Sequence, residues 1–566
     1  METSSFRRIS EVILDEVLSW EPSYATQLGW HKYDDVLPDW SAHSHQHQLE
    51  RMNAIVRDLS KMDRTSLSDD EQIDADLGIH FLKLRIFELD ELRLKEKASM
   101  AAKEIGDALF FLFARDRPAL EQRLLSITAR LERVPAFIEM VQKEIKTPYG
   151  LWNEIQCETG DRLPSLLKEI EGLCDAECND MKTMIRLKAA AKDATNAVEQ
   201  HNNWLRKEVI PISSEEYSIG ADLYRRYLLM KGFGVSAEET LHIAELHLED
   251  VNRRKAEISK EIVGSGRPQD AIRKMRGDHP ATSRDVLDGY RSSVQRARRF
   301  VEMNKLVTLP KGEQLSIIET PYFMRHLLAY AAQFEPGRFD DDMKGLFLVT
   351  PEDGTPALLE EHSYTSIENT SVHEGYPGHH LHGVCMNLHP SLIRPLCQSP
   401  DFAEGWALYC EEMMLSQGYN DNPMGRLMIL NDIAFRIARQ ICDVKLSTGS
   451  MTVGKAAEFI AAQTETNMKA AESEAKSIML SPTYFMSYFV GKLGVLQIRD
   501  DVERAMGAKF DLGFFHDSLI YSGCMPMSFM RRAVALRLKE KHGIRLDEPG
   551  ETLYDYALRI LKEKAA

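Results

Sequence analysis

The sequence lacks the features of a disulfide-stabilised or membrane-spanning protein. Eight cysteines occur among 566 residues, and they form no C-x-x-C pair. Such sparse use of cysteine is typical of reducing compartments. No stretch approaches the roughly 18 consecutive apolar residues of a transmembrane helix, and the N-terminus has no apolar segment followed by a small-residue cleavage site. We therefore expect a cytoplasmic protein that contacts no membrane.

The sequence also lacks an excess of positive charge. Lysine and arginine total 70, whereas aspartate and glutamate total 87, which gives a net charge of −17. Proteins that bind nucleic acids or anionic membranes need a positively charged surface, so the composition argues against both kinds of partner. Apolar residues make up 43% and charged residues 28%, as in ordinary globular proteins. The composition defines neither the substrate nor the oligomeric state.

Proline is absent from three long tracts, which predicts long helices. These tracts lie between residues 38 and 118, 211 and 268, and 423 and 482. Helix interiors exclude proline because its ring removes a hydrogen bond and clashes with the preceding turn. Apolar residues recur with helical spacing over residues 70–94, 163–205 and 236–262. The predicted fold class is therefore mainly α.

Strand patterns are few and close together. Three short aliphatic or β-branched segments, each ending at a proline, are predicted strands: 305–310, 315–321 and 345–351. We expect them to form one small sheet beside the helix that carries the histidine motif described next. If 345–351 is an edge strand, an extended substrate backbone can pair with it.

Histidines gather in one short window. Six of the 18 fall between residues 362 and 389: His362, His373, His379, His380, His382 and His389. His373-Glu374 begins the H-E-x-x-H motif, in which two histidines one helical turn apart bind zinc and the glutamate acts as general base. Position 377 is proline, so the strict motif is absent. A bulge at Pro377-Gly378 that absorbs two residues returns His379 to the place of the missing ligand. His380 is the alternative, but it needs a larger insertion.

A third ligand is predicted on a downstream helix. Glu404 lies 25 residues beyond His379 in the segment AEGWALYCEE, a spacing at which glutamate zincins take their third ligand. Glu411 lies two turns later on the same helix face and is placed to orient a histidine. An alternative without a metal is that Ser371 and Glu374 form a capping box and the histidines form a polar turn.

The segments HEGYPGHH and EGWALYCEE resemble the hallmark segments of a bacterial family filed as "domain of unknown function 885". That family resembles the glutamate-type zinc metallopeptidases, including the thimet-oligopeptidase and carboxypeptidase-Taq groups. An N-terminal family pattern is also present: Pro22, Ala25, Thr26, Leu28, Gly29, His31, Tyr33 and Asp34. A C-terminal pattern appears as Phe515, His516, Asp517, Ile520, Gly523, Pro526 and Met527. Where the family usually has Gly and Gln, this chain has Thr483 and Tyr484.

The resemblance implies a large helical zincin-like body. Residues 1–566 are expected to form a single metallohydrolase-like unit, with a subdivision into a helical region, 1–300, and a catalytic region with the sheet, 301–566. The predicted activity is zinc-dependent hydrolysis of peptide or peptide-like amide bonds. His373, His379 and Glu404 would hold Zn²⁺, and Glu374 would act as general base.

The remaining site residues are predicted from the same segments. Tyr488 is the first candidate for a donor to the developing oxyanion, and His516 is the second. Arg499 and Arg325 are candidates for binding a substrate carboxylate, and Tyr484 belongs to an aromatic pocket that would contact substrate.

Two other functions remain open at this stage. The site could hydrolyse a small non-peptide amide in specialised metabolism, or the chain could be a helical binding protein without catalysis. The zinc content of the purified protein separates the last alternative from the other two, because a catalytic zinc should approach one ion per chain.

Overall fold

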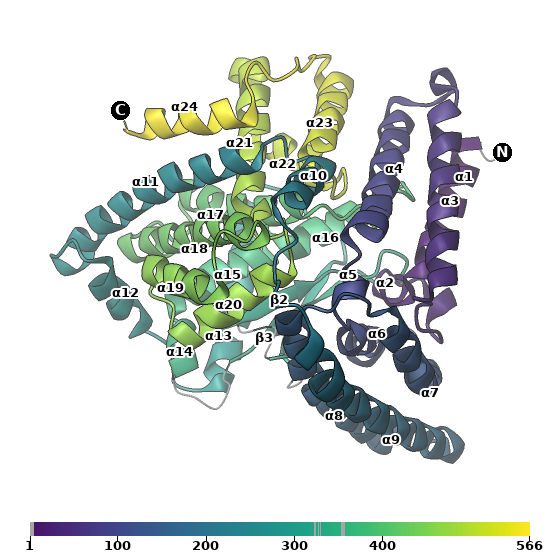
Figure 1. The fold of residues 1–566 in the computed structure, drawn as a ribbon. Coiled ribbons are helices and arrows are strands. Elements are labelled where there is room, and N and C mark those ends of the chain that lie inside the picture. Colours follow the sequence, from purple (N-terminus) through teal and green to yellow (C-terminus); the bar gives the residue numbers. More distant parts are fainter. Residues whose placement is uncertain (1–4, 322–323, 326–327, 329, 352–356, 566) are drawn as a thin grey trace.

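The computed structural model describes all residues except 1–4, 322–323, 326–327, 329, 352–356 and 566. Helices dominate the first half of the chain, as predicted (Figure 1). They are α1 (Ser5–Trp20), α2 (Pro22–Gln27), α3 (Ala42–Lys61), α4 (Asp69–Phe87), α5 (Leu94–Lys97), α6 (Ala101–Ala114), α7 (Leu120–Glu144), α8 (Gly150–Glu177), α9 (Met181–Trp204), α10 (Ala221–Lys231), α11 (Ala237–Val263), α12 (Pro268–Arg276) and α13 (Ser283–Met303).

The second half contains a sheet and further helices. The strands are β1 (Gln314–Glu319), β2 (Ala331–Phe334) and β3 (Lys344–Val349). The helices are α14 (Ala357–Glu361), α15 (Tyr364–Thr370), α16 (His379–Asn387), α17 (Pro400–Ser416), α18 (Pro423–Ser447), α19 (Val453–Thr464), α20 (Met468–Leu480), α21 (Ser487–Met506), α22 (Leu512–Ile520), α23 (Met527–His542) and α24 (Leu553–Ala565). The mainly α fold with one small sheet is therefore confirmed.

The local sequence explains where the predicted helices begin and end. Helix α11 starts at a capping box in which Ser236 and Glu239 bond each other's backbone N–H. The tract 163–205 forms two helices rather than one, because the Asp180 side chain accepts hydrogen bonds from Lys182 N and Thr183 N and starts a new helix there.

The sheet has the order β1-β3-β2, with β1 parallel and β2 antiparallel to β3. Strands at 315–321 and 345–351 are thus confirmed in essence, but the predicted strand 305–310 is wrong. There the backbone is held by helix α22 instead: Leu306 O lies 2.7 Å from His516 Nδ1, and Thr308 N donates to Asp517 at 2.9 Å. Because β3 is the central strand, the prediction that 345–351 offers a free edge to substrate is also wrong; the edges are β1 and β2.

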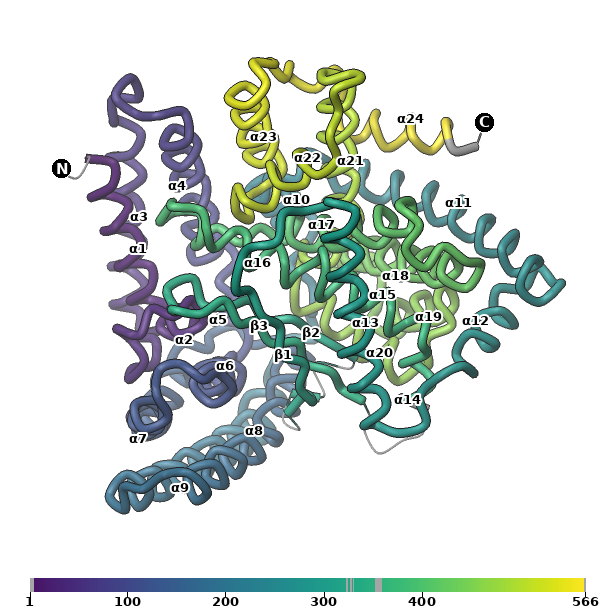
Figure 2. Tube along the Cα trace, turned by 180° about the vertical axis from the view of Figure 1, so that it is seen from behind, coloured from purple at the N-terminus to yellow at the C-terminus, as the bar shows by residue number. Residues whose placement is uncertain are grey.

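One hydrophobic core crosses from the N-terminal helices to the C-terminal ones. It contains Leu14 of α1, Leu77 of α4, Trp406 of α17 and Phe515 of α22. Figure 2 shows α1, α3 and α4 standing together beside α16, with the sheet between them and α13. Helix α17 packs along α21, and α11 packs along α18. Among the described residues, no helix combines the length and apolar character needed to cross a membrane.

Candidate metal centre

The histidine motif lies on two helical segments separated by a short break. Helix α15 runs into a single π-helical turn, Ser371–Gly375, the chain leaves the helix at residues 376–378, and α16 begins at His379. The break is tight, since a Cβ on Gly378 would lie 1.8 Å from His373 O. The interruption at Pro377-Gly378 is therefore present as predicted, although the π-helical turn precedes it. Ser371 does not cap a helix, because it lies inside this turn.

The break brings His373 and His379 together on Glu404 of α17. Oε2 of Glu404 lies 3.2 Å from His379 Nε2 and 3.8 Å from His373 Nε2, and one ligand atom from each residue lies within 4.8 Å of the other two. Tetrahedral zinc with bonds of about 2.0–2.1 Å holds its ligand atoms about 3.3 Å apart. Glu404 Oε2 is buried and accepts no hydrogen bond from any described residue. Two imidazoles and an orphaned buried carboxylate oxygen are a donor set that fits a zinc ion.

Glu411 orients the first histidine, as expected from its place on α17. Its Oε1 lies 2.7 Å from His373 Nδ1, and Asn369 donates to its Oε2 at 2.9 Å. Burial opposes ionisation of Glu411, but the guanidinium of Arg436 and the imidazole of His373 outweigh this effect and hold its pKa below the usual range. An ionised Glu411 accepts a hydrogen bond from the Nδ1–H group of His373, which leaves the Nε2 lone pair for a metal.

Trp406 fixes the break in the histidine motif against α17. Its indole Nε1 donates to Pro377 O at 2.9 Å, and the side chain is fully buried. Helix α17 is itself pressed onto α21 at Gly405, where a Cβ would lie 2.4 Å from the carbonyl carbon of Gly491. The distance between His379 and Glu404 is thus set by packing that involves three helices.

A buried carboxylate shapes the turn that carries Tyr484. The backbone N–H groups of Thr483, Phe485 and Met486 donate to Asp443 of α18 at 2.8, 2.9 and 3.1 Å. This places the Tyr484 hydroxyl 2.6 Å from Glu404 Oε1, to which it donates. The residue predicted to contact substrate therefore also holds the candidate metal ligand.

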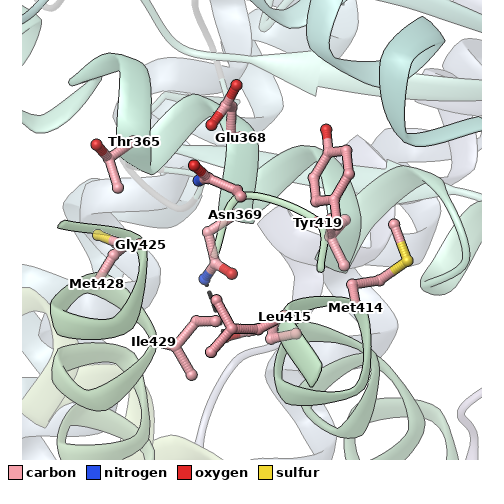
Figure 3. Close-up of a pocket in the computed structure, with 12 residues that line it drawn as sticks. Thr365, Glu368, Asn369, Met414, Leu415, Tyr419, Gly425, Met428 and Ile429 are labelled. Atoms are coloured by element: carbon pink, nitrogen blue, oxygen red, sulfur yellow. Dashed lines mark hydrogen bonds between the residues drawn. The ribbon is translucent and has the colours of Figure 1, made fainter. Parts of the chain in front are cut away.

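A cavity of about 430 Å³ reaches this cluster at His373. Its wall includes His373, Glu374, Tyr484 and Tyr488. The Glu374 side chain makes no hydrogen bond or ion pair with any described residue, so its carboxylate is available to a ligand in the cavity. A neighbouring pocket lined by Asn369 and Glu411, shown in Figure 3, has a volume of about 10 Å³, room for about one water molecule. The larger cavity is the one that can hold a substrate.

Some predicted residues lie away from the cluster. His380 Nε2 is 3.1 Å from Glu313, which also accepts the Tyr376 hydroxyl, so this imidazole is committed elsewhere. His516 Nε2 lies 2.9 Å from the hydroxyl of Tyr409. Tyr409 is about 140° around α17 from Glu404, at about 100° per residue, and neither it nor His516 lines the cavity.

The two arginines predicted to bind a carboxylate are also distant from the cavity. Arg499 pairs with Asp500 at 3.2 Å, and Arg325 pairs with Glu319 and donates to Thr320 O at 3.0 Å. Neither lines the cavity. Three other arginines do: Arg276, Arg436 and Arg439.

Asn369 and Arg436 were not predicted from the sequence. Asn369 lies four residues before His373, and this i, i+4 spacing on one helix face could have indicated its role. Arg436 pairs with Asp432 at 3.2 Å in an i, i+4 arrangement on α18 and lies 3.5 Å from Glu411. Nothing local indicates that α18 packs beside the histidines.

Residues 22–534 match the family described as "Bacterial protein of unknown function (DUF885)". The chain belongs to this family. The match spans the N-terminal pattern around His31 and both segments that supply the candidate ligands. The family expected from the sequence is thereby confirmed, and its description assigns no activity to this DUF885 protein.

Two solved structures share the fold of this DUF885 protein. One, described as "a putative lipoprotein of unknown function from Shewanella oneidensis", is 22% identical, with 94% of this chain and 99% of that chain covered and a TM-score of 0.77. The other, "the putative lipoprotein from Colwellia psychrerythraea", is 16% identical, with 95% and 100% covered and a TM-score of 0.79. These descriptions do not support the cytoplasmic location predicted from the sequence. No curated protein matches the chain.

The predicted likeness to glutamate-type zinc peptidases stays a prediction. A carboxypeptidase from Pyrococcus furiosus is 12% identical with 100% of both chains covered, but its TM-score is 0.37. No argument rests on so low a score.

Proposed function

We propose that this protein is a zinc-dependent hydrolase of peptide or peptide-like amide bonds. One observation carries the proposal: His373, His379 and Glu404 converge within 4.8 Å of one another, and His373 and Glu374 line a large cavity. Three protein ligands from imidazole and carboxylate, with a position left for water or substrate, are the composition of a catalytic zinc site.

Each residue has a separate part in the proposed reaction. A bound zinc supplies Lewis-acid activation of a carbonyl group and of water. The Glu374 carboxylate accepts the proton of the attacking water and returns it to the leaving nitrogen. Tyr488, which lies beside Tyr484 with the ring centroids 6.0 Å apart, is the candidate to donate a hydrogen bond to the developing oxyanion.

The class of amide is supported by the cavity wall. Ala331 of the edge strand β2 lines the cavity, which favours an extended peptide-like substrate whose main chain follows the strand. The aromatic rings of Tyr484, Phe485 and Tyr488 line it as well, and they favour the second candidate, a small non-peptide amide. Comparing unblocked dipeptides with N-acylated amino acids as substrates distinguishes these classes.

A Glu374→Gln variant tests the proposal. We expect the purified variant to hold close to one zinc per chain, as the wild-type protein should, and to lose at least about 100-fold in turnover, because the general base is gone. Glu458→Gln, an equivalent change at an exposed position of α19, should retain both. A wild-type protein with little zinc and no activation by added zinc would instead favour a non-catalytic binding protein.

A further inference from the structure

Arg439 of α18 lies in the wall of the same cavity inside a frame of aromatic rings. Its guanidinium carbon is 4.3 Å from the ring centre of Tyr488, 4.5 Å from that of Phe435 and 5.0 Å from that of Phe485. Only 7% of the residue is exposed. The rings hold the guanidinium plane by cation–π contact but supply no acceptor for its N–H groups.

This arginine donates no hydrogen bond to any described residue. Its closest acid is Glu474 of α20, at 3.6 Å between Nη1 and Oε2, which is beyond hydrogen-bond distance. Arg439 Nε and Glu474 Oε2 are both buried without a hydrogen-bond partner. An ion pair at this distance leaves the donors of the buried guanidinium without acceptors, which is costly unless a ligand supplies one.

Other buried arginines of the chain have closer hydrogen-bond or ion-pair partners than Arg439. The guanidinium of fully buried Arg130 donates to carbonyl oxygens that include Val36 O, at 3.0 Å, and to the Thr26 hydroxyl at 2.7 Å. In the cavity wall, Arg276 pairs with Glu361 at 3.0 Å, and Arg436 pairs with Asp432 at 3.2 Å. Arg436 Nε is also buried without a hydrogen-bond partner, but both of these arginines lie closer to an acid than Arg439, whose distance to Glu474 is 3.6 Å.

We propose that Arg439 binds the free carboxylate of the substrate. The substrate class is then an amide whose leaving part ends in a carboxylate, such as the C-terminal residue of a peptide or an N-acylated amino acid. The positions agree with this class, because Tyr488 contacts both Arg439 and Tyr484. Tyr484 in turn donates a hydrogen bond to the candidate metal ligand Glu404. The inference rests on the proposed hydrolase function for the placement of the scissile bond, but the carboxylate subsite itself does not require turnover.

The wild-type protein provides the first test. An N-acetylated dipeptide with a free C-terminus and the same compound as its C-terminal amide are compared by kcat/KM. Charged hydrogen bonds contribute about 1.5–3 kcal/mol, so the free acid should be preferred at least about 10-fold. Where the compounds are hydrolysed, equal rates or a preference for the amide overturn the inference, as does a strict requirement for a free amino terminus in place of the carboxylate.

Binding without turnover provides the second test. N-acetylphenylalanine should bind the zinc-free protein at least about 10-fold more tightly than N-acetylphenylalaninamide, and Arg439→Gln should abolish this ratio while Arg439→Lys retains part of it. Arg276→Gln, which changes an arginine already paired in the same cavity, should leave the ratio unchanged. A ratio that persists in Arg439→Gln overturns the inference. If the binding ratio holds but the wild-type protein hydrolyses neither amide, the hydrolase proposal fails and the carboxylate subsite stands.

Discussion

The hydroxyl of Tyr484 donates a hydrogen bond of 2.6 Å to Oε1 of Glu404, while Oε2 of the same carboxylate faces the two histidines. One carboxylate thus has two separate environments, and its rotation is fixed by a tyrosine from the turn before α21. This chain has tyrosine where the family resemblance leads one to expect glutamine. The hydrogen bond occupies Oε1 and leaves Oε2 as the oxygen that would hold a metal.

Removing this hydroxyl should weaken metal binding. For Tyr484→Phe we expect the zinc dissociation constant to rise about 10-fold, since outer-shell partners of metal ligands contribute about 10–100-fold to affinity. Competition with a chelator of known affinity measures the change. Tyr488→Phe is the matched control, because Tyr488 lines the same cavity, whereas the hydroxyl group that donates to Glu404 belongs to Tyr484. The zinc affinity of Tyr488→Phe should change less than about twofold. Equal losses in both variants would contradict the role of the Tyr484 bond.

Glu411 should also strengthen zinc binding, because it orients His373. In Glu411→Gln the amide accepts the Nδ1–H bond weakly and brings no negative charge, so zinc affinity should fall about 10–100-fold. Zinc titration at constant pH checks this value. Because Arg436 would lose one of its two acidic partners, the melting temperature of the zinc-free variant should be measured in parallel. A zinc affinity equal to that of the wild type would exclude Glu411 from the site.

The two adjacent histidines should behave differently on substitution. His379→Gln removes a proposed ligand and should lower zinc affinity by more than about 100-fold, which exceeds the effect of an outer-shell change. His380→Gln instead breaks the buried contact with Glu313 and should cost about 1–3 kcal/mol of stability with zinc affinity largely kept. Calorimetric zinc titration and thermal unfolding of both variants test this difference. The reverse pattern would assign the ligand to His380.

His31, part of the N-terminal family pattern, should make stability depend on pH. Burial opposes protonation, but hydrogen bonds to Asp34 at 2.8 Å and Asp340 at 3.0 Å outweigh it and raise the pKa of His31 to about 9. The unfolded value is about 6.5. The imidazolium therefore stabilises the fold fully below about pH 6.5, and this contribution is lost as the pH rises through about 9.

A His31→Gln variant isolates that contribution. At about pH 6 its melting temperature should lie about 1 °C below that of the wild type, the effect of about 1 kcal/mol after allowance for partial exposure. At about pH 9.5 the two temperatures should nearly coincide, since the wild-type imidazole is then neutral. A difference that is constant across this range would show that the histidine acts through packing alone.

Local patterns were sufficient to predict the centre of the candidate site. His373, Glu374, Glu404 and Glu411 follow from helix periodicity and from the interruption at Pro377, because their relative positions depend on few residues of chain. The choice of His379 over His380 rested on the smaller insertion, and the structure places His379 beside Glu404. The strands around 315–321 and 345–351 were equally accessible to prediction, since β-branched and aliphatic runs are local features.

The features that the sequence did not predict depend on contacts between distant segments. His516 was assigned to the oxyanion from its family pattern, yet α22 packs on the side of α17 that faces away from Glu404. No sequence pattern indicates the strand order that makes β3 central. The short strand β2, Ala-Ala-Gln-Phe, also lacks the aliphatic or β-branched run that predicted the other strands. Arg439 was overlooked because its distinguishing property is a buried guanidinium that donates no hydrogen bond to any described residue, which only the packed structure can reveal.

The hydrogen bond from Trp406 to Pro377 O has a consequence for how the proposed site would acquire a metal. The histidines lie in separate helical segments, and their distance from Glu404 is set by a tryptophan on α17. A chain that has formed its helices but not docked α17 therefore presents two histidines without their carboxylate. Metal affinity then reports tertiary assembly rather than helix content, and a bound ion raises the free energy of unfolding of the whole core that joins the two halves of the chain.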